Sequence, residues 1–227
     1  MTTPIPPQFR DAAAHIVRVC QRLDARELIA GQDGNVSVRV APDRILVTPA
    51  GFAKYALTPD DLVLLALDGT QYAGTHAPSS EVAVHLRAYQ QRPDVHAVIH
   101  AHPVHATAFT VIGETLPHDV LPEVTVLLGR IPFVPYATPG TPEVAVAFDR
   151  WWADHDVFLM EHHGALTVGG TLALAEQRME SLEHAARILL VARAAGPVGA
   201  LPRRAVKELE ALHAARRTHL LQGPGTQ

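Results

Sequence analysis

Residues 95–112 read VHAVIHAHPVHATAFTVI and place a β-rich run, a histidine pair and a helical segment in one short stretch. Valine and isoleucine within residues 95–101 indicate a strand, and residues 104–113 are typical of a helix. Side chains two apart on a strand point to the same face, so His100 and His102 could hold one metal ion from one side. The alternative is a pair of histidines that face solvent at the end of a strand.

Strand and helix signals alternate on both sides of this stretch. The expected strands are 35–40, 44–48, 62–67, 95–101, 131–136 and two β-rich parts of 157–170. The expected helices are 8–30 with Gly31 as its stop, a helix from Ser79 through Tyr89, 104–113, Pro142 through Trp152, 171–194 and 202–221, with a further helix start at 58–61. The turn at residues 41–43 makes the first two strands antiparallel neighbours. This order predicts an α/β fold with a mixed sheet covered by helices.

Length and composition narrow the class of protein. The chain has 227 residues, of which 48 % are hydrophobic and 19 % charged, so we expect one globular domain over 1–227 with flexible tails at about 1–8 and 217–227. A net charge of −4 argues against a nucleic-acid partner. The single cysteine excludes an intrachain disulfide. The start MTTPIPPQFRD resembles no signal peptide, and no apolar run is long enough for a membrane span. We therefore expect a cytoplasmic protein without a membrane partner.

A second histidine motif, Glu161-His162-His163-Gly164, follows the apolar run VFLM and should also end a strand. Gly164 permits a sharp turn that would aim a neighbouring histidine. A third imidazole beside the first two would leave one open position, which is the pattern of catalytic zinc. The alternative is a polar turn.

Two further features could bind an anion. Ser79-Ser80-Glu81 begins a helix, where capping explains one serine and the acid but not both serines. His85, four residues after Glu81 on the same face, has a structural interpretation. Glycine-containing turns lie next to two expected strands, at residues 31–35 before the first and 48–51 after the second. Backbone amides in such turns can approach a phosphate. Each of these turns, taken alone, is also explained as a simple turn.

Together these segments resemble the class II aldolase/adducin family, and within it the enzymes that cleave L-fuculose 1-phosphate. The matching pieces are GNVSVR, ILVTPAG, PSSEVAVHLRAYQQRPDVHAVIHAHPVHATA, IPFVPYATPGT and HHGALTVG, in this order over about residues 10–195. The resemblance implies a three-layer α/β/α sandwich with a mostly antiparallel central sheet. It also implies a homotetramer with active sites at subunit interfaces.

The resemblance further implies one Zn²⁺ per chain, which Mn²⁺ or Co²⁺ could replace, held by His100, His102 and His163 with Glu81 in the resting enzyme. The substrate would be a ketose 1-phosphate, which chelates the metal and is cleaved to dihydroxyacetone phosphate and an aldehyde. Glu81 would leave the metal and carry the proton at C3. The implied phosphate contacts are Gly34, Asn35, Ala50, Gly51, Ser79 and Ser80.

Two departures concern the aldehyde end of the site. Val126 stands where the family's tyrosine is expected, and residues 202–227 contain no aromatic side chain. Sister reactions on the same histidines are the main alternative: dehydration, decarboxylation or 4-epimerisation, although the epimerases carry Asp where this chain has Glu81. A non-catalytic adducin-like binding module is the distant alternative. For other side chains we expect packing by Trp151 and Trp152, a buried Cys20, a solvated Lys54 and an Arg39 that points away from the phosphate.

Overall fold

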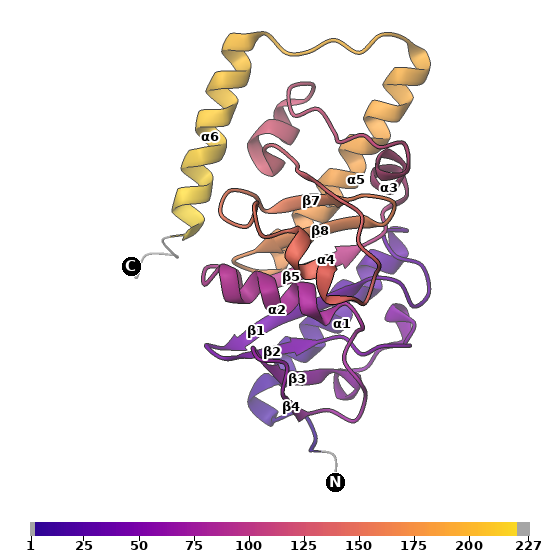
Figure 1. Ribbon diagram of the computed structural model, residues 1–227, viewed down its shortest axis with the longest axis vertical. Helices are drawn as coiled ribbons and strands as arrows, with labels where there is room; N and C mark the ends of the chain where they lie inside the picture. Colours follow the sequence, from indigo (N-terminus) through magenta and orange to yellow (C-terminus); the bar gives the residue numbers. More distant parts are fainter. Residues whose placement is uncertain (1–2, 222–227) are drawn as a thin grey trace.

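The structure, a computed structural model, describes residues 3–221 and is built around one eight-stranded sheet (Figure 1). The strands are β1 (Asn35–Ala41), β2 (Arg44–Val47), β3 (Val63–Ala66), β4 (Gln71–Ala73), β5 (Ala97–Ala101), β6 (Phe133–Val134), β7 (Val157–Met160) and β8 (Gly164–Gly169). Their order across the sheet is β4-β3-β2-β1-β5-β8-β7-β6. All neighbours pair antiparallel except β6 and β7, which are parallel.

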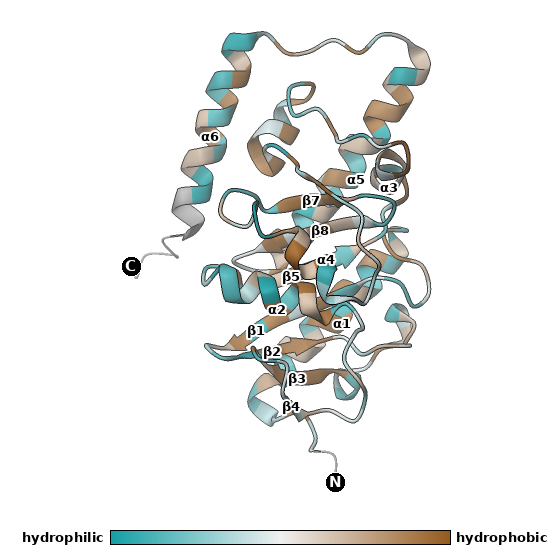
Figure 2. Cartoon of the chain, viewed as in Figure 1, coloured by the Kyte–Doolittle hydropathy of each residue, from teal (hydrophilic) through white to brown (hydrophobic). Residues whose placement is uncertain are grey.

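Helices cover both faces of the sheet, and the two faces form separate apolar cores (Figures 1 and 2). The helices are α1 (Arg10–Ala25), α2 (Val82–Gln91), α3 (Val104–Val111), α4 (Pro142–Ala147), α5 (Leu172–Ala195) and α6 (Arg203–Leu221), with a π-helix at Val124–Leu128. One core joins the sheet to α1, α3 and α5, and the other joins it to α2 and α4. This arrangement confirms the expected α/β/α sandwich with a mostly antiparallel sheet.

Strand alternation decides which residues of the central strands meet α2. Ile99 of β5 packs into the core beside α1 and α5, whereas Val98 packs into the core beside α2. Because successive side chains alternate between faces, His100 lies on the α2 side. Asn35 of β1 pairs directly with His100 in the sheet, so it shares this face. The α2 side of the central strands therefore carries polar groups where a purely apolar face would be expected.

Helix boundaries differ from the sequence prediction at several places. α2 begins at Val82 after the N-cap Glu81 rather than at Ser79, and no side chain caps it, so the expected serine cap is wrong. α1 ends at Ala25 rather than near residue 30, because Glu27 takes a left-handed φ of 57° and the Leu28 amide bonds to Leu23 O. That ending buries Leu28 in the core without a glycine, so Gly31 is not the stop. α4 ends at Ala147, and turns carry the chain to Trp152, which stacks on Phe148. The predicted helix start at 58–61 is a single 3-10 turn (Pro59–Asp61) with a capping box.

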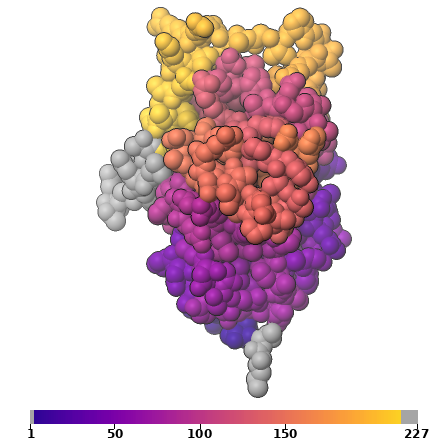
Figure 3. All heavy atoms as spheres, in the orientation of Figure 1, coloured from indigo at the N-terminus to yellow at the C-terminus, as the bar shows by residue number. Residues whose placement is uncertain are grey.

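The C-terminal part of the described chain lies at the end of the molecule opposite the N-terminus (Figure 3). α6 contacts the π-helix, and its Arg217 bonds to the buried Asp156. Of the two expected tails, residues 1–2 and 222–227 lie outside the described part, while Ile5 is buried and Thr3 O accepts from the Gly74 amide. Within residues 3–221, no helix has both the length and the apolar character of a membrane span.

Candidate metal centre

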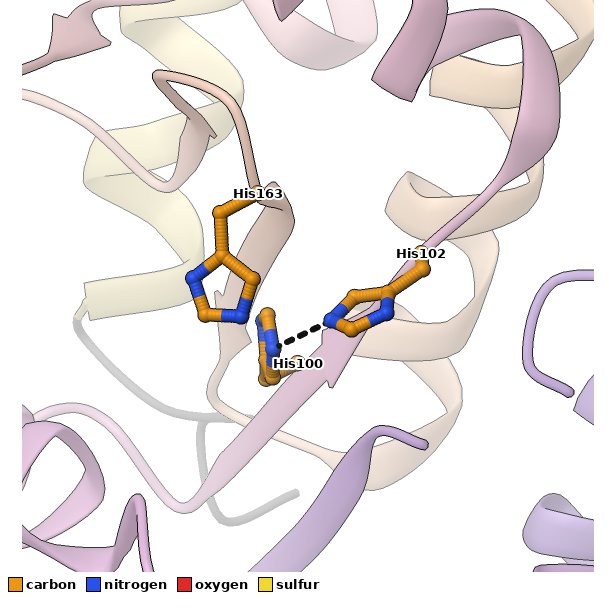
Figure 4. Close-up of side chains that lie close together, drawn as sticks. All are labelled: His100, His102 and His163. Carbon is orange, nitrogen blue, oxygen red and sulfur yellow. Dashed lines mark hydrogen bonds between the residues drawn. The ribbon is translucent and has the colours of Figure 1, made fainter. Parts of the chain in front are cut away.

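Three histidines converge beside the end of β5 (Figure 4). His100 lies on β5, His102 is the first residue after this strand, and His163 comes from the turn between β7 and β8. One ligand atom of each ring lies within 4.8 Å of the others, and the Nε2 atoms of His100 and His102 are 3.0 Å apart. The structure thus brings together His100, His102 and His163, the three histidines that the family resemblance implied as metal ligands.

The outer nitrogens of two of these rings face acceptors. His100 Nδ1 is 2.9 Å from Ala165 O, so this nitrogen donates and Nε2 keeps a free electron pair. His102 Nδ1 is 3.5 Å from a carboxylate oxygen of Asp33, which favours the same tautomer. Burial lowers the pKa of His102 and lowers the pKa of His163 to about 4, so both rings are neutral near pH 7.

Glu81 completes the cluster from the first position before α2. Its Oε2 lies 3.3 Å from His100 Nε2, and its Oε1 lies 3.2 Å from His163 Nε2. Burial alone would raise the pKa of Glu81, but His100, His163 and a bond from Asn35 outweigh it and hold this pKa well below its ordinary value. The buried Oε1 has no hydrogen-bond partner among residues 3–221.

These contacts fit a bound cation. Facing electron pairs on the two Nε2 atoms and on the carboxylate repel one another unless a positive charge lies between them. Ligand nitrogens on tetrahedral zinc would be about 3.3 Å apart for bonds of about 2.0–2.1 Å. The separation of 3.0 Å between the His100 and His102 nitrogens is close to that value. The residues that could hold a divalent metal are therefore His100, His102 and His163, with Glu81 at the same point.

The turn that carries His163 is built differently from the sequence interpretation. His162, not Gly164, takes the left-handed conformation, with φ of 53°, and its side chain is exposed. Gly164 is required for another reason, because a Cβ there would lie 2.6 Å from Ala101 O and 2.6 Å from His102 Cδ2. The absent side chain lets β8 approach the end of β5 closely enough for the three rings to meet.

The three segments expected to hold a phosphate lie side by side. Thr48 O accepts from the Ser79 amide, and the Asn35 amide nitrogen reaches Glu81 beside Ser80. The residues predicted to bind the phosphate differ in their exposure and in which hydrogen-bonding groups are already used. The Ala50 N–H already donates to Ala77 O, and Ser79 Oγ accepts from the Glu81 amide. Gly51 and Ser80 are exposed, with φ of 76° at Gly51, whereas Gly34, Asn35 and Ser79 are buried.

Lys54 was expected to be solvated, and this expectation is wrong. Its side chain is 2 % exposed, and Nζ donates to Gln32 O and Phe52 O at 2.7 and 2.9 Å. Lys54 therefore ties the turn at 31–34 to the turn at 48–53. Burial lowers the pKa of its ammonium, whereas Cys20, Asp33 and Glu81 act to raise it. Nothing in the sequence around Lys54 indicates this role, because one lysine in a polar turn is usually solvent-exposed.

The other expectations for single side chains were met in most cases. Cys20 and Trp152 are buried, whereas Trp151 is half-buried. Arg39 points away from the phosphate segments and donates to Val95 O, Pro42 O and Tyr89 O. Val126 lies in the π-helix, where its carbonyl accepts from His213.

Comparison with known proteins shows the family to which the chain belongs. Residues 14–190 match the model of the Class II Aldolase and Adducin N-terminal domain. A 5-methylthioribulose-1-phosphate/5-deoxyribulose-1-phosphate aldolase of Escherichia coli is 36 % identical over 160 residues, or 70 % of this chain and 74 % of that protein. A 3-oxo-tetronate 4-phosphate decarboxylase of another Escherichia coli strain is 31 % identical over 180 residues, or 78 % and 84 %. The crystal structure of L-fuculose-1-phosphate aldolase from Thermus thermophilus is 32 % identical with a TM-score of 0.73, and the match covers 84 % of this chain and 98 % of that chain. The chain therefore belongs to the class II aldolase and adducin family.

Proposed function

We propose that this protein is a metal-dependent aldolase that cleaves a ketose 1-phosphate to dihydroxyacetone phosphate and an aldehyde. L-fuculose 1-phosphate or a related deoxyketose 1-phosphate is the proposed substrate. The observation that carries the proposal is Glu81, whose buried Oε1 has no hydrogen-bond partner within the described residues and lies 3.2 Å from His163 Nε2 at the edge of the phosphate segments. A carboxylate in this position can exchange a proton with the carbon next to a carbonyl group.

The reaction divides between the metal and the chain. A divalent cation, zinc in our proposal and replaceable by manganese or cobalt, would supply Lewis-acid polarisation of the substrate carbonyl. As the C3–C4 bond breaks, the C4 hydroxyl would lose its proton to solvent and become the aldehyde. The electron pair left at C3 would spread onto the C2 oxygen, and Glu81 would pass a proton taken from solvent to C3. The turns at 31–35 and 48–51 and the serines at 79–80 would hold the phosphate. Because sugar phosphates are charged and stay within the cell, we also propose a cytoplasmic location.

A retro-aldol assay tests this function and its need for a phosphate. We expect dihydroxyacetone phosphate to be released from a ketose 1-phosphate, with kcat/KM for the free ketose about 10²–10⁴-fold lower. Two lost hydrogen bonds to a charged group, at about 1.5–3 kcal/mol each, account for that range. Ser79→Ala combined with Ser80→Ala should raise KM for the phosphorylated ketose. Equal kcat/KM for the two ketoses would contradict a phosphate site and indicate an unphosphorylated substrate.

Decarboxylation is the second candidate, because a 3-oxo-tetronate 4-phosphate decarboxylase is among the relatives. Loss of CO₂ also leaves an electron pair next to a carbonyl, so the same histidines and carboxylate would serve. Release of CO₂ from an oxo-acid phosphate, without cleavage of any ketose 1-phosphate, would favour this candidate. A chain that binds no divalent metal would instead favour a binding module.

We also propose that the protein is a homotetramer with active sites at subunit interfaces. Exposed apolar side chains on and beside two helices of one face support assembly: Val104 and Val111 on α3, the following Ile112, and Ile188 and Val191 on α5. We expect light scattering to give about four times the chain mass of 24.5 kDa. A fully active monomer would contradict the sharing of active sites.

A further inference from the structure

A continuous line of buried polar groups runs from Glu81 into the interior between α2 and the sheet. Glu81, His85 and Tyr89 recur every four residues along one face of the α2 segment, and they meet Asn35 and Ser37 of β1. Ser37 and His85 are 0 % exposed, and Asn35 and Tyr89 are 2 % exposed. Consecutive groups lie at hydrogen-bond distance: Tyr89 Oη to Ser37 Oγ 2.8 Å, Ser37 Oγ to His85 Nδ1 2.6 Å, His85 Nε2 to Asn35 Oδ1 2.5 Å, and Asn35 Nδ2 to Glu81 Oε2 3.0 Å.

The chemistry of the two ends decides the direction of each bond. An ionised Glu81 can only accept, so the Asn35 NH₂ group must face it and the Asn35 carbonyl must face His85. His85 Nε2 must therefore carry the proton. Burial lowers the pKa of His85 to about 3, so the ring is neutral and its Nδ1 can only accept. The Ser37 hydroxyl then donates to Nδ1 and accepts from the Tyr89 hydroxyl.

We propose that His85 is a positioning residue, which holds the Asn35 side-chain amide in the one orientation that donates to Glu81. A reversed amide would set its carbonyl oxygen against the Glu81 carboxylate. With Oε2 held by Asn35, the unpartnered Oε1 is directed at His163 and the metal centre.

This inference rests on the proposed function, in which Glu81 carries the C3 proton, and adds the device that orients it. A merely structural role for His85 would make its loss a matter of folding stability alone. The positioning role instead predicts a change in proton transfer at Glu81 in a protein that is still folded and metal-loaded. Substitution of residues that lie behind metal-site groups and orient them commonly lowers activity by about 10–100-fold.

The first test replaces His85 in the metal-loaded enzyme. His85→Leu removes the donor to Asn35, and we expect exchange of the C3 proton of dihydroxyacetone phosphate with D₂O to slow by about 10–100-fold. His85→Gln can place an amide N–H toward Asn35 and should recover part of the rate. Tyr89→Phe should cause a smaller loss than His85→Leu, because Ser37 can still donate to His85 without it. His118→Leu, which removes a half-buried histidine bonded to Glu210, is the matched control.

The outcomes separate the inference from the proposed function. No exchange by the wild-type enzyme would defeat the proposed function itself. A folded His85→Leu variant that exchanges the C3 proton at the wild-type rate would contradict the positioning role of His85. So would rates that merely follow the melting temperatures of the variants.

A second test needs no variant, so it stands even if His85→Leu does not fold. The ¹⁵N resonances of the wild-type histidines report which ring nitrogen carries the proton. We expect His85 to be neutral and protonated at Nε2. A His85 ring protonated at Nδ1 would reverse the chain and overturn the inference.

Discussion

Glu81→Gln should slow exchange of the C3 proton of dihydroxyacetone phosphate by about 10²–10⁴-fold, the usual contribution of a general acid or base. The amide has nearly the same shape, and its carbonyl can still accept from Asn35 at the position where Oε2 lies 3.0 Å from Nδ2. The three histidines should retain about one metal ion per chain. The loss would therefore be one of proton transfer and not of assembly of the site.

The measurement is the disappearance of the C3 proton signal in D₂O, followed by NMR, together with metal content by elemental analysis. Glu208→Gln is a suitable control, because this carboxylate on α6 is exposed and paired with Arg204. Exchange at the wild-type rate in Glu81→Gln would show that another group moves the proton.

His163→Ala should weaken metal binding relative to the wild type. Two histidines and Glu81 would remain, and the missing nitrogen is the one supplied by the β7–β8 turn. An ion that binds only the folded chain, at a free concentration about 100 times its dissociation constant, raises the free energy of unfolding by about 2.7 kcal/mol. At one fixed zinc concentration, added zinc should therefore raise the melting temperature of the wild-type protein clearly more than that of His163→Ala.

The adjacent residue supplies the control for this experiment. His162 is exposed and lies in the same turn, and asparagine tolerates its left-handed φ of 53°. His162→Asn should bind zinc as the wild type does. Equal stabilisation of His163→Ala and the wild type by zinc would place the ion elsewhere.

The sequence predicted the central elements because their signals are local. The β-rich run before His100 and the apolar run before His163 each formed a strand with a histidine at or near its end. β4 was missed, since it has three residues of which only Ala73 is buried, too few for an alternating pattern. The end of α1 was misplaced because Glu27, a residue with a side chain, takes the left-handed position that glycine usually fills.

What the sequence could not provide were contacts between distant segments. Lys54 bonds to Gln32 across 22 positions, and His85 bonds to Asn35 across 50. Neither residue has a distinctive neighbour in the sequence, so a lysine in a turn and a histidine on a helix were given their commonest interpretations. Helix periodicity did place His85 on the face of Glu81, but the partners on β1 became visible only with the sheet register.

The position of β5 and β8 inside the sheet bears on how the candidate metal centre would gain and lose its ion. Central strands open only in the rarest, nearly global fluctuations, whereas edges and loops open often. His100 lies on β5, and Gly164 at the start of β8 fixes the turn that carries His163. The three histidines are thus held by the strands that we expect to open least often. We therefore expect that the chain folds before it binds a metal ion, and that a chain stripped by a chelator rebinds the ion without refolding.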